Sequence, residues 1–190
     1  MTITYNTYDY WFNNPEILPC GGDQYKSAIV FEGLVKTLDI PSEGWCVQLG
    51  TYTGYTLQLM KQWFGTHRVY GIDKFNPTND PSVLIQDINE IQFNLPIAYA
   101  ENDVGTMYEA PQDRLVAFKW AISNLVPGGV LITTSNVANA AFGESVESIC
   151  SAHRCTWTRL DVYDNQPWAQ QLNKETIWNT ISMMLVRKII

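Results

Sequence analysis

The segment that most constrains the fold runs from residue 46 to residue 64, where an apolar run, a short turn and a helical pattern follow one another directly. The apolar run ends at Gly50, and Gly54 closes the turn. Apolar residues then recur with helical spacing from Tyr55 to Phe64. In an open α/β sheet, ligands meet backbone N–H groups at this kind of strand-to-helix turn. The segment therefore predicts both an α/β fold and a binding site.

A second apolar run, 69–72, follows this helix and ends in a carboxylate, Asp73. If the two runs form neighbouring parallel strands, Asp73 and the glycine turn meet at one edge of the sheet. A carboxylate in that place can accept hydrogen bonds from both hydroxyls of a ribose. The pair of segments therefore points to a ligand that contains a nucleoside.

Strand and helix patterns alternate along the rest of the chain. The expected strands are 45–49, 68–72, 96–100, 130–133, 156–162 and 180–187, and the expected helices are 24–38, 55–64, 113–125 and 142–150. Residues 83–88 are too few for periodicity to decide between a strand and a short helix. The order predicts an α/β fold with a Rossmann-like, mostly parallel sheet, helices on both faces and an antiparallel edge hairpin.

The domain organisation follows from length and composition. With 190 residues, the chain is expected to form an irregular N-terminal arm, 1–22, and a single domain, 23–190. The net charge of −7 and the lack of a Lys/Arg cluster argue against nucleic acid as a partner. No apolar run approaches the roughly 18 residues that span a membrane, and the N-terminus lacks a signal-peptide pattern, so we expect a cytoplasmic protein without a membrane partner.

Four segments together resemble the class I S-adenosylmethionine-dependent methyltransferases. Residues 48–54 are similar to the family's glycine turn, and Asp73 falls on its ribose-binding acid. Residues 87–88 lie where the family places an acidic–apolar pair beside the adenine, and 125–132 resemble its Leu-x-Pro-Gly-Gly turn before the fifth strand. The sequence of 44–54, followed by that of 70–75, is most similar to the macrocin-type and catechol-type small-molecule O-methyltransferases.

The resemblance implies S-adenosyl-L-methionine as the cofactor and a small hydroxylated metabolite as the substrate of an O-methyl transfer. The cofactor-binding residues that it implies are Gln48, Gly50, Thr51, Tyr52, Gly54, Tyr55, Asp73, Lys74, Asp87 and Ile88. For Gly50 and Gly54 the alternative is relief of backbone strain in the turn, and for Lys74 it is a solvated surface position.

The candidates for proton transfer are Glu101 and Asp103, because they follow the strand expected at 96–100. In the metal-dependent branch of the family, such acids also hold a divalent cation. That branch has further ligands after the fifth strand, where this chain offers only Asn136. A site of Glu101, Asp103 and Asn136 would be poor in carboxylates for a hard cation. Alternatively, the two acids cap the next helix or face solvent.

Gln48 also departs from the family pattern, which has an acid at this position. Its amide oxygen can accept a hydrogen bond from the cofactor's ammonium, but without the strength of a charged acceptor. Together with Thr134 and Ser135 after the fifth strand, Gln48 keeps open a catalytically inactive protein that binds a nucleoside or a partner. An NAD-linked oxidoreductase would call for Gly-x-Gly-x-x-Gly, of which the turn holds only Gly50 and Gly54.

Two further expectations concern the edges of the domain. The stretch between Asp73 and Glu101 is short, so one crossover helix should be missing or reduced. The aromatic residues of the arm, among them Tyr8 and Trp11, could cover an apolar substrate. They could equally dock on the first helix or on a second subunit, which leaves a homodimer open.

Overall fold

The computed structural model describes residues 35–51, 54–104, 111–134, 145–160 and 183–190. These residues form a seven-stranded sheet with the order β3-β2-β1-β4-β5-β7-β6. The strands are β1 (Trp45–Leu49), β2 (Val69–Asp73), β3 (Val83–Ile85), β4 (Ile97–Asn102), β5 (Leu125–Thr134), β6 (Cys155–Leu160) and β7 (Met183–Lys188). The expected arm, 1–22, lies outside the described residues.

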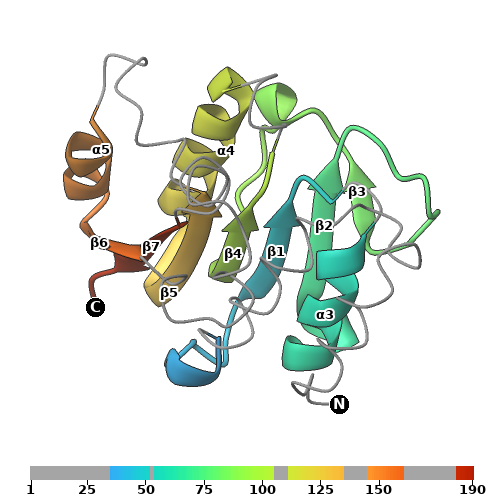
Figure 1. Ribbon diagram of the computed structural model, residues 1–190, viewed down its shortest axis with the longest axis horizontal. Helices are drawn as coiled ribbons and strands as arrows, with labels where there is room; N and C mark the ends of the chain where they lie inside the picture. The colour runs from blue at the N-terminus through green and yellow to red at the C-terminus, as the bar shows by residue number, and fades with distance from the viewer. Residues whose placement is uncertain (1–34, 52–53, 105–110, 135–144, 161–182) are drawn as a thin grey trace, which may run out of the picture.

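The sheet is mostly parallel, as the alternating pattern predicts. β3, β2, β1, β4 and β5 pair in parallel, whereas β7 runs antiparallel to both β5 and β6. The two last strands therefore form the predicted antiparallel edge (Figure 1). Because the strands that precede them all run the same way, the carboxyl ends of β1, β2 and β4 lie at one edge.

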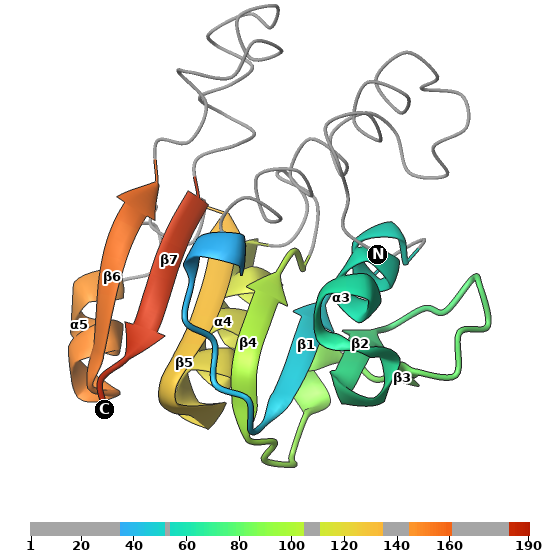
Figure 2. The ribbon, with the colours of Figure 1, turned by 90° about the horizontal axis from the view of Figure 1, so that it is seen from below.

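Helices cover both faces of the sheet, which confirms the expected layers. α3 (Tyr55–Phe64) lies on one face and α4 (Pro111–Asn124) on the other, and α5 (Val146–Ala152) lies beside β6 (Figures 1 and 2). Two short 3-10 turns are η2 (Thr66–Arg68) and η3 (Ile88–Glu90). Of the helix expected at 24–38, only residues 35–38 are described; 35–37 are helical, and residue 38 is a bend.

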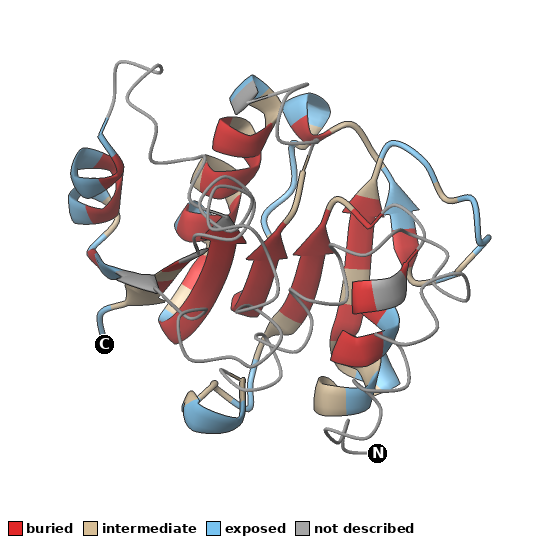
Figure 3. Ribbon diagram, viewed as in Figure 1, coloured by how far each residue is buried: buried red, intermediate tan, exposed pale blue. Residues whose placement is uncertain are grey.

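Burial is concentrated in the central strands (Figure 3). On the α4 face, a hydrophobic core cluster joins Val47 and Leu49 of β1 to Leu131 of β5 and Phe118 of α4. The opposite face is more polar, and there the ring of Tyr99 lies 4.9 Å from the ring of Phe64 on α3.

Two connections differ from an ordinary strand–helix–strand unit. Residues 74–96 contain β3 and η3 but no α-helix, which confirms the missing crossover helix. The turn expected at 127–129 lies inside β5 as a bulge, because a step of two residues along β4, from 97 to 99, corresponds to a step of five along β5, from 125 to 130. Gly128 makes the bulge possible with φ +78°, a conformation that costs other residues energy.

Candidate functional site

The glycine turn leaves β1 at Gly50 and enters α3 at Gly54. Both glycines have positive φ, +78° and +76°, which only glycine adopts without strain. The N–H of Gly54 donates to the carbonyl of Thr51 (2.7 Å) and closes the turn. Tyr52 lies outside the described residues, and Tyr55 is described only as the first residue of α3. The prediction that these two tyrosines contact a cofactor therefore stays a prediction.

Gly50 also lets the segment that follows β4 come close to the turn. A Cβ at this position would lie 2.5 Å from the carbonyl oxygen of Asp103 and 2.9 Å from the Cα of Val104. The N–H of Asp103 donates to the carbonyl of Leu49 (2.8 Å), and that of Gly50 to the carbonyl of Ile72 (2.9 Å). The ends of β1, β2 and β4 thus meet at one point.

Asp73 links the end of β2 to the glycine turn. Its Oδ2 accepts from the backbone N–H of Thr51 (2.6 Å) and from the Thr51 hydroxyl (3.3 Å), and its Oδ1 accepts from the N–H of Phe75 (3.0 Å). A Cβ on Gly71 would collide with Cγ2 of Thr51, so that glycine gives the threonine its room. The structure therefore brings Gly50, Thr51 and Asp73 together, as the sequence predicts.

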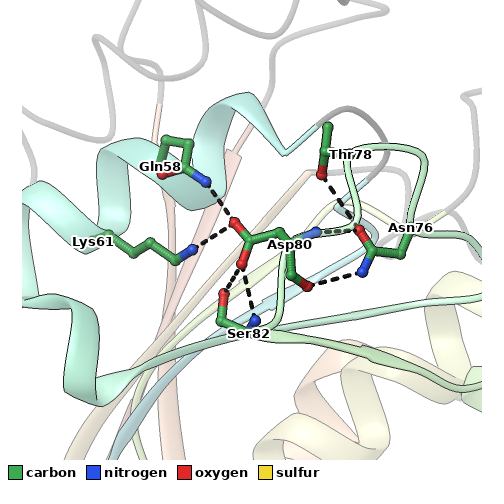
Figure 4. A network of polar contacts seen from close by, with 6 residues as sticks. All are labelled: Gln58, Lys61, Asn76, Thr78, Asp80 and Ser82. Atoms are coloured by element: carbon green, nitrogen blue, oxygen red, sulfur yellow. Dashed lines mark hydrogen bonds and ion pairs between the residues drawn. The ribbon is translucent and has the colours of Figure 1, made fainter.

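The loop after β2 is fixed to α3 by a network around Asp80 (Figure 4). Asp80 Oδ2 accepts from Gln58 Nε2 (2.6 Å) and forms an ion pair with Lys61 Nζ (2.6 Å), and both side chains of the pair are about nine-tenths buried, at 12% and 9% exposure. Asp80 Oδ1 accepts from the N–H and the hydroxyl of Ser82. Burial raises the pKa of Asp80, but these hydrogen bonds and the Lys61 charge outweigh it and hold the pKa well below its usual value.

The same loop is stiffened by Asn76. Its Oδ1 accepts from the N–H of Asp80 (3.0 Å) and from the Thr78 hydroxyl (3.3 Å), and its Nδ2 donates to the carbonyl of Asp80 (2.8 Å). Thr78 Oγ1 is the nearest atom to the Cβ position of Gly54, at 3.8 Å. This network borders the turn and was not predicted, although the Asn and Asp residues of 76–80 are typical of side chains that bond to nearby backbone.

The predicted adenine residues lie farther along, at the start of η3. Asp87 accepts from the backbone and side-chain nitrogens of Asn89 (2.9 and 3.0 Å), and these bonds, together with Lys74, lower its pKa. Lys74 forms ion pairs with Asp87 (3.1 Å) and Asp113 (3.4 Å), which raise the pKa of the lysine. Ile88 packs into the hydrophobic cluster of the α4 face. Lys74 is therefore not an isolated surface cation.

Glu101 lies in β4 and Asp103 follows that strand directly, and the surroundings of both carboxyl groups differ from those of surface carboxylates. Burial raises the pKa of Asp103 to about 6, although the Arg114 guanidinium nearby lowers it. Burial also raises the pKa of Glu101 well above its usual value, and the charge of Asp103 adds to this. Arg114 is itself buried, and its Nε donates to the carbonyl of Val104 (2.8 Å). Arg114 was not predicted as part of the site.

Gln48 lies below the turn on β1 and is 2% exposed. Its Oε1 has no hydrogen-bond partner in the described part of the chain. Leaving a buried acceptor unsatisfied costs about 1–3 kcal/mol, so such an atom calls for an explanation.

The predicted metal site can be followed only in part. Asn136 lies outside the described residues, so its relation to Glu101 and Asp103 stays a prediction. In the ranges that the structure describes, no three His, Cys, Asp or Glu side chains gather as a metal site requires. In the same ranges, no helix is long and apolar enough to cross a membrane.

Comparison with known proteins identifies the fold. No protein-family model matches the chain, and no curated protein matches its sequence. An S-adenosylmethionine-dependent methyltransferase from Clostridium acetobutylicum ATCC 824 superposes with a TM-score of 0.55 at 13% identity, over 98% of this chain and 99% of that chain. The amino pentose methyltransferase of calicheamicin biosynthesis from Micromonospora echinaspora, with S-adenosylmethionine bound, gives a TM-score of 0.54 at 11% identity over 99% of both chains.

A third similar structure is the 1,6-didemethyltoxoflavin-N1-methyltransferase of Burkholderia thailandensis, with a TM-score of 0.53 at 10% identity, over 98% of this chain and 87% of that chain. These likenesses, together with the strand order and the antiparallel edge, show that the chain has the Rossmann-like fold of the class I methyltransferases. At such low identity they establish the fold and leave activity to the residues of the site.

Proposed function

We propose that this protein is an S-adenosylmethionine-dependent methyltransferase that methylates a hydroxyl of a small metabolite. The observation that carries the proposal is the meeting of the glycine turn with Asp73, through the 2.6 Å hydrogen bond from the N–H of Thr51. This places a carboxylate and a strand-to-helix turn at the carboxyl end of the sheet, where α/β proteins bind nucleotides.

The residues present fit such a cofactor. A carboxylate has about four lone-pair sites, so Asp73 can hold the turn and still accept from a ribose hydroxyl. Gln48 offers a buried, unpartnered acceptor below the turn for an ammonium group. When bound, S-adenosylmethionine supplies an electrophilic methyl group on a sulfonium. The chain's own part is to hold both reactants close and to receive the proton of the acceptor.

Asp103 is the proposed proton acceptor. Its pKa of about 6 leaves the carboxylate ionised at neutral pH, but makes it more basic than a surface aspartate. A hydroxyl must lose its proton during methyl transfer, so a base of this strength beside the turn favours an O-methyl transfer over transfer to a neutral amine. The acceptor itself is a small molecule in this proposal, and neither a metal nor a second subunit is required by it.

A titration with S-adenosylhomocysteine tests the proposal. Folded protein should bind this product, and Asp73→Asn should weaken binding about tenfold or more, because the charged acceptor for the ribose is lost. Glu43→Gln removes the same charge from an exposed position before β1, at the opposite end of the sheet, and should bind as the wild type does. Absence of binding at millimolar ligand would refute the proposal.

A second candidate is a protein with this fold that binds an adenosyl ligand without catalysing transfer. It is favoured by the uncharged Gln48 and by the raised pKa of Glu101, which together leave the buried part of the site without a strong anion. Cofactor binding without turnover on a broad panel of hydroxylated acceptors would support it. Turnover on one acceptor that is lost in Asp103→Asn would rule it out.

A further inference from the structure

Two polar side chains of α3 reach the loop after β2 from the helix face that begins at the glycine turn. Gln58 and Lys61 follow Gly54 at intervals of four and three residues, so the three positions share one face of the helix. Gln58 Nε2 and Lys61 Nζ each lie 2.6 Å from Oδ2 of Asp80 (Figure 4). The helix that carries the glycine turn therefore also holds the loop.

The loop held in this way is tied to β2 at both of its ends. At its start, Oδ1 of Asp73 accepts from the N–H of Phe75 (3.0 Å). At its end, the N–H of Gly71 donates to the carbonyl of Ser82 (3.0 Å), and the N–H of Ser82 donates to Oδ1 of Asp80 (2.9 Å). The carboxylate at the end of β2 thus belongs to the same hydrogen-bonded unit as Asp80.

The ion pair of Lys61 and Asp80 is suited to fix the place of this loop. Both partners are about nine-tenths buried. A buried ion pair stabilises a fold little more than apolar side chains of the same volume would, because the cost of removing two charges from water offsets their attraction. The hydrogen bonds around it nevertheless define one geometry, since two donors of α3 converge on Oδ2 of Asp80 and two donors of Ser82 converge on Oδ1.

We propose that the ion pair of Lys61 and Asp80 positions the Asp73 carboxylate for the ribose of the cofactor, by holding the loop after β2 at a fixed distance from the glycine turn. This rests on the proposed function. Lys61 and Asp80 are positioning residues that act through the loop: Asp73 binds the N–H of Phe75, and the next residue, Asn76, bonds to the N–H and the carbonyl of Asp80.

The loop also lies against the turn itself, which makes the distance between them sensitive to the ion pair. Thr78 Oγ1 is 3.8 Å from the Cβ position of Gly54, and Oδ2 of Asp73 accepts from the N–H of Thr51 on the other side of the turn. A loop released from α3 could shift against both contacts. The direction of the Asp73 carboxylate would then vary, and a ribose bound to it would lose affinity.

A double-mutant cycle between Lys61 and Asp73 tests the inference by calorimetry with S-adenosylhomocysteine. Methionine is close to the lysine stem in length but carries no charge, so Lys61→Met should weaken binding roughly threefold to thirtyfold. In the Asp73→Asn background the same substitution should change the affinity by less than about twofold, because the group that it positions is already lost. Lys188→Met makes the same change at the far edge of the sheet, on β7, and should bind as the wild type does.

Two results would overturn the inference. Lys61→Met could bind S-adenosylhomocysteine as the wild type does, or it could lose the same factor in both backgrounds, which would show that the ion pair does not act through Asp73. If Lys61→Met does not fold in urea-unfolding controls, Lys61→Met/Asp80→Asn removes both charges together and takes its place in the cycle, with the same expected result. Wild-type protein that binds while these variants change nothing refutes this inference alone, whereas wild-type protein that does not bind refutes the proposed function with it.

Discussion

Replacing Asp103 by asparagine is expected to stabilise the fold at neutral pH and to change little at pH 4. Burial raises the pKa of this carboxyl from 3.8 to about 6 in the folded protein. Between these values the folded state holds a proton that the unfolded chain has already released, so the free energy of unfolding falls as the pH rises from about 4 to 6. Since each pH unit corresponds to about 1.36 kcal/mol, the loss by neutral pH is at most about 3 kcal/mol.

Asparagine has no proton to release, so the variant should lack this part of the pH dependence. The variant also removes the attraction between the Asp103 carboxylate and the nearby Arg114 guanidinium. The free energy of unfolding should therefore increase by at most about 3 kcal/mol. Urea unfolding followed by tryptophan fluorescence at pH 4, 5, 6 and 7.5 measures the effect. Glu90→Gln, an exposed carboxylate of η3, is the control and should change the free energy of unfolding by less than about 0.5 kcal/mol throughout. A stability difference for Asp103→Asn that does not vary with pH, or that is destabilising at pH 7.5, would refute the reasoning.

Three further substitutions test the contacts that hold the glycine turn and the loop after β2 in place. Gly50→Ala should destabilise the fold by about 2–4 kcal/mol in urea unfolding, because it adds a backbone collision at 2.5 Å to the cost of a positive φ. Gly54→Ala should destabilise it by only about 1 kcal/mol, since the nearest atom to its Cβ position is 3.8 Å away. Equal effects of the two substitutions would contradict the close approach of the backbone to Gly50. Asp80→Asn should cost about 2–4 kcal/mol at pH 7, because Lys61 stays buried without its partner. Because the pKa of Asp80 is lowered in the folded protein, the stability that its carboxylate contributes is present above about pH 4 and is lost as the pH falls below this value. A cost of Asp80→Asn that is equal at pH 2.5 and pH 7 would therefore contradict the role of the ion pair.

The sheet could be predicted from the sequence because its signals are local. The apolar runs that end at Gly50 and Asp73 reproduce β1 and β2 within a residue. The bulge in β5 could not be predicted in this way, since 125–130 contains the usual signals of a turn. Whether a Pro-Gly-Gly segment ends a strand or bulges out of it is decided by pairing with β4, which is a long-range property.

The arrangement of the candidate site could be predicted for residues whose position follows from the end of a strand. Asp73 and Thr51 meet as expected, because parallel neighbouring strands bring their carboxyl ends together. The burial of Glu101 and its pairing with Gln48 were not predictable, since they depend on the register between strands 53 residues apart in the chain. The ion pairs of Lys74 likewise join three segments that only the fold brings together.

The most direct test of the central claim is a crystal structure of the protein grown with S-adenosylhomocysteine. We predict electron density for the adenosyl group at the turn between Gly50 and Gly54, with a ribose hydroxyl within hydrogen-bond distance of the Asp73 carboxylate. A turn filled by the protein's own side chains, or a ligand bound elsewhere with Asp73 away from it, would contradict the account.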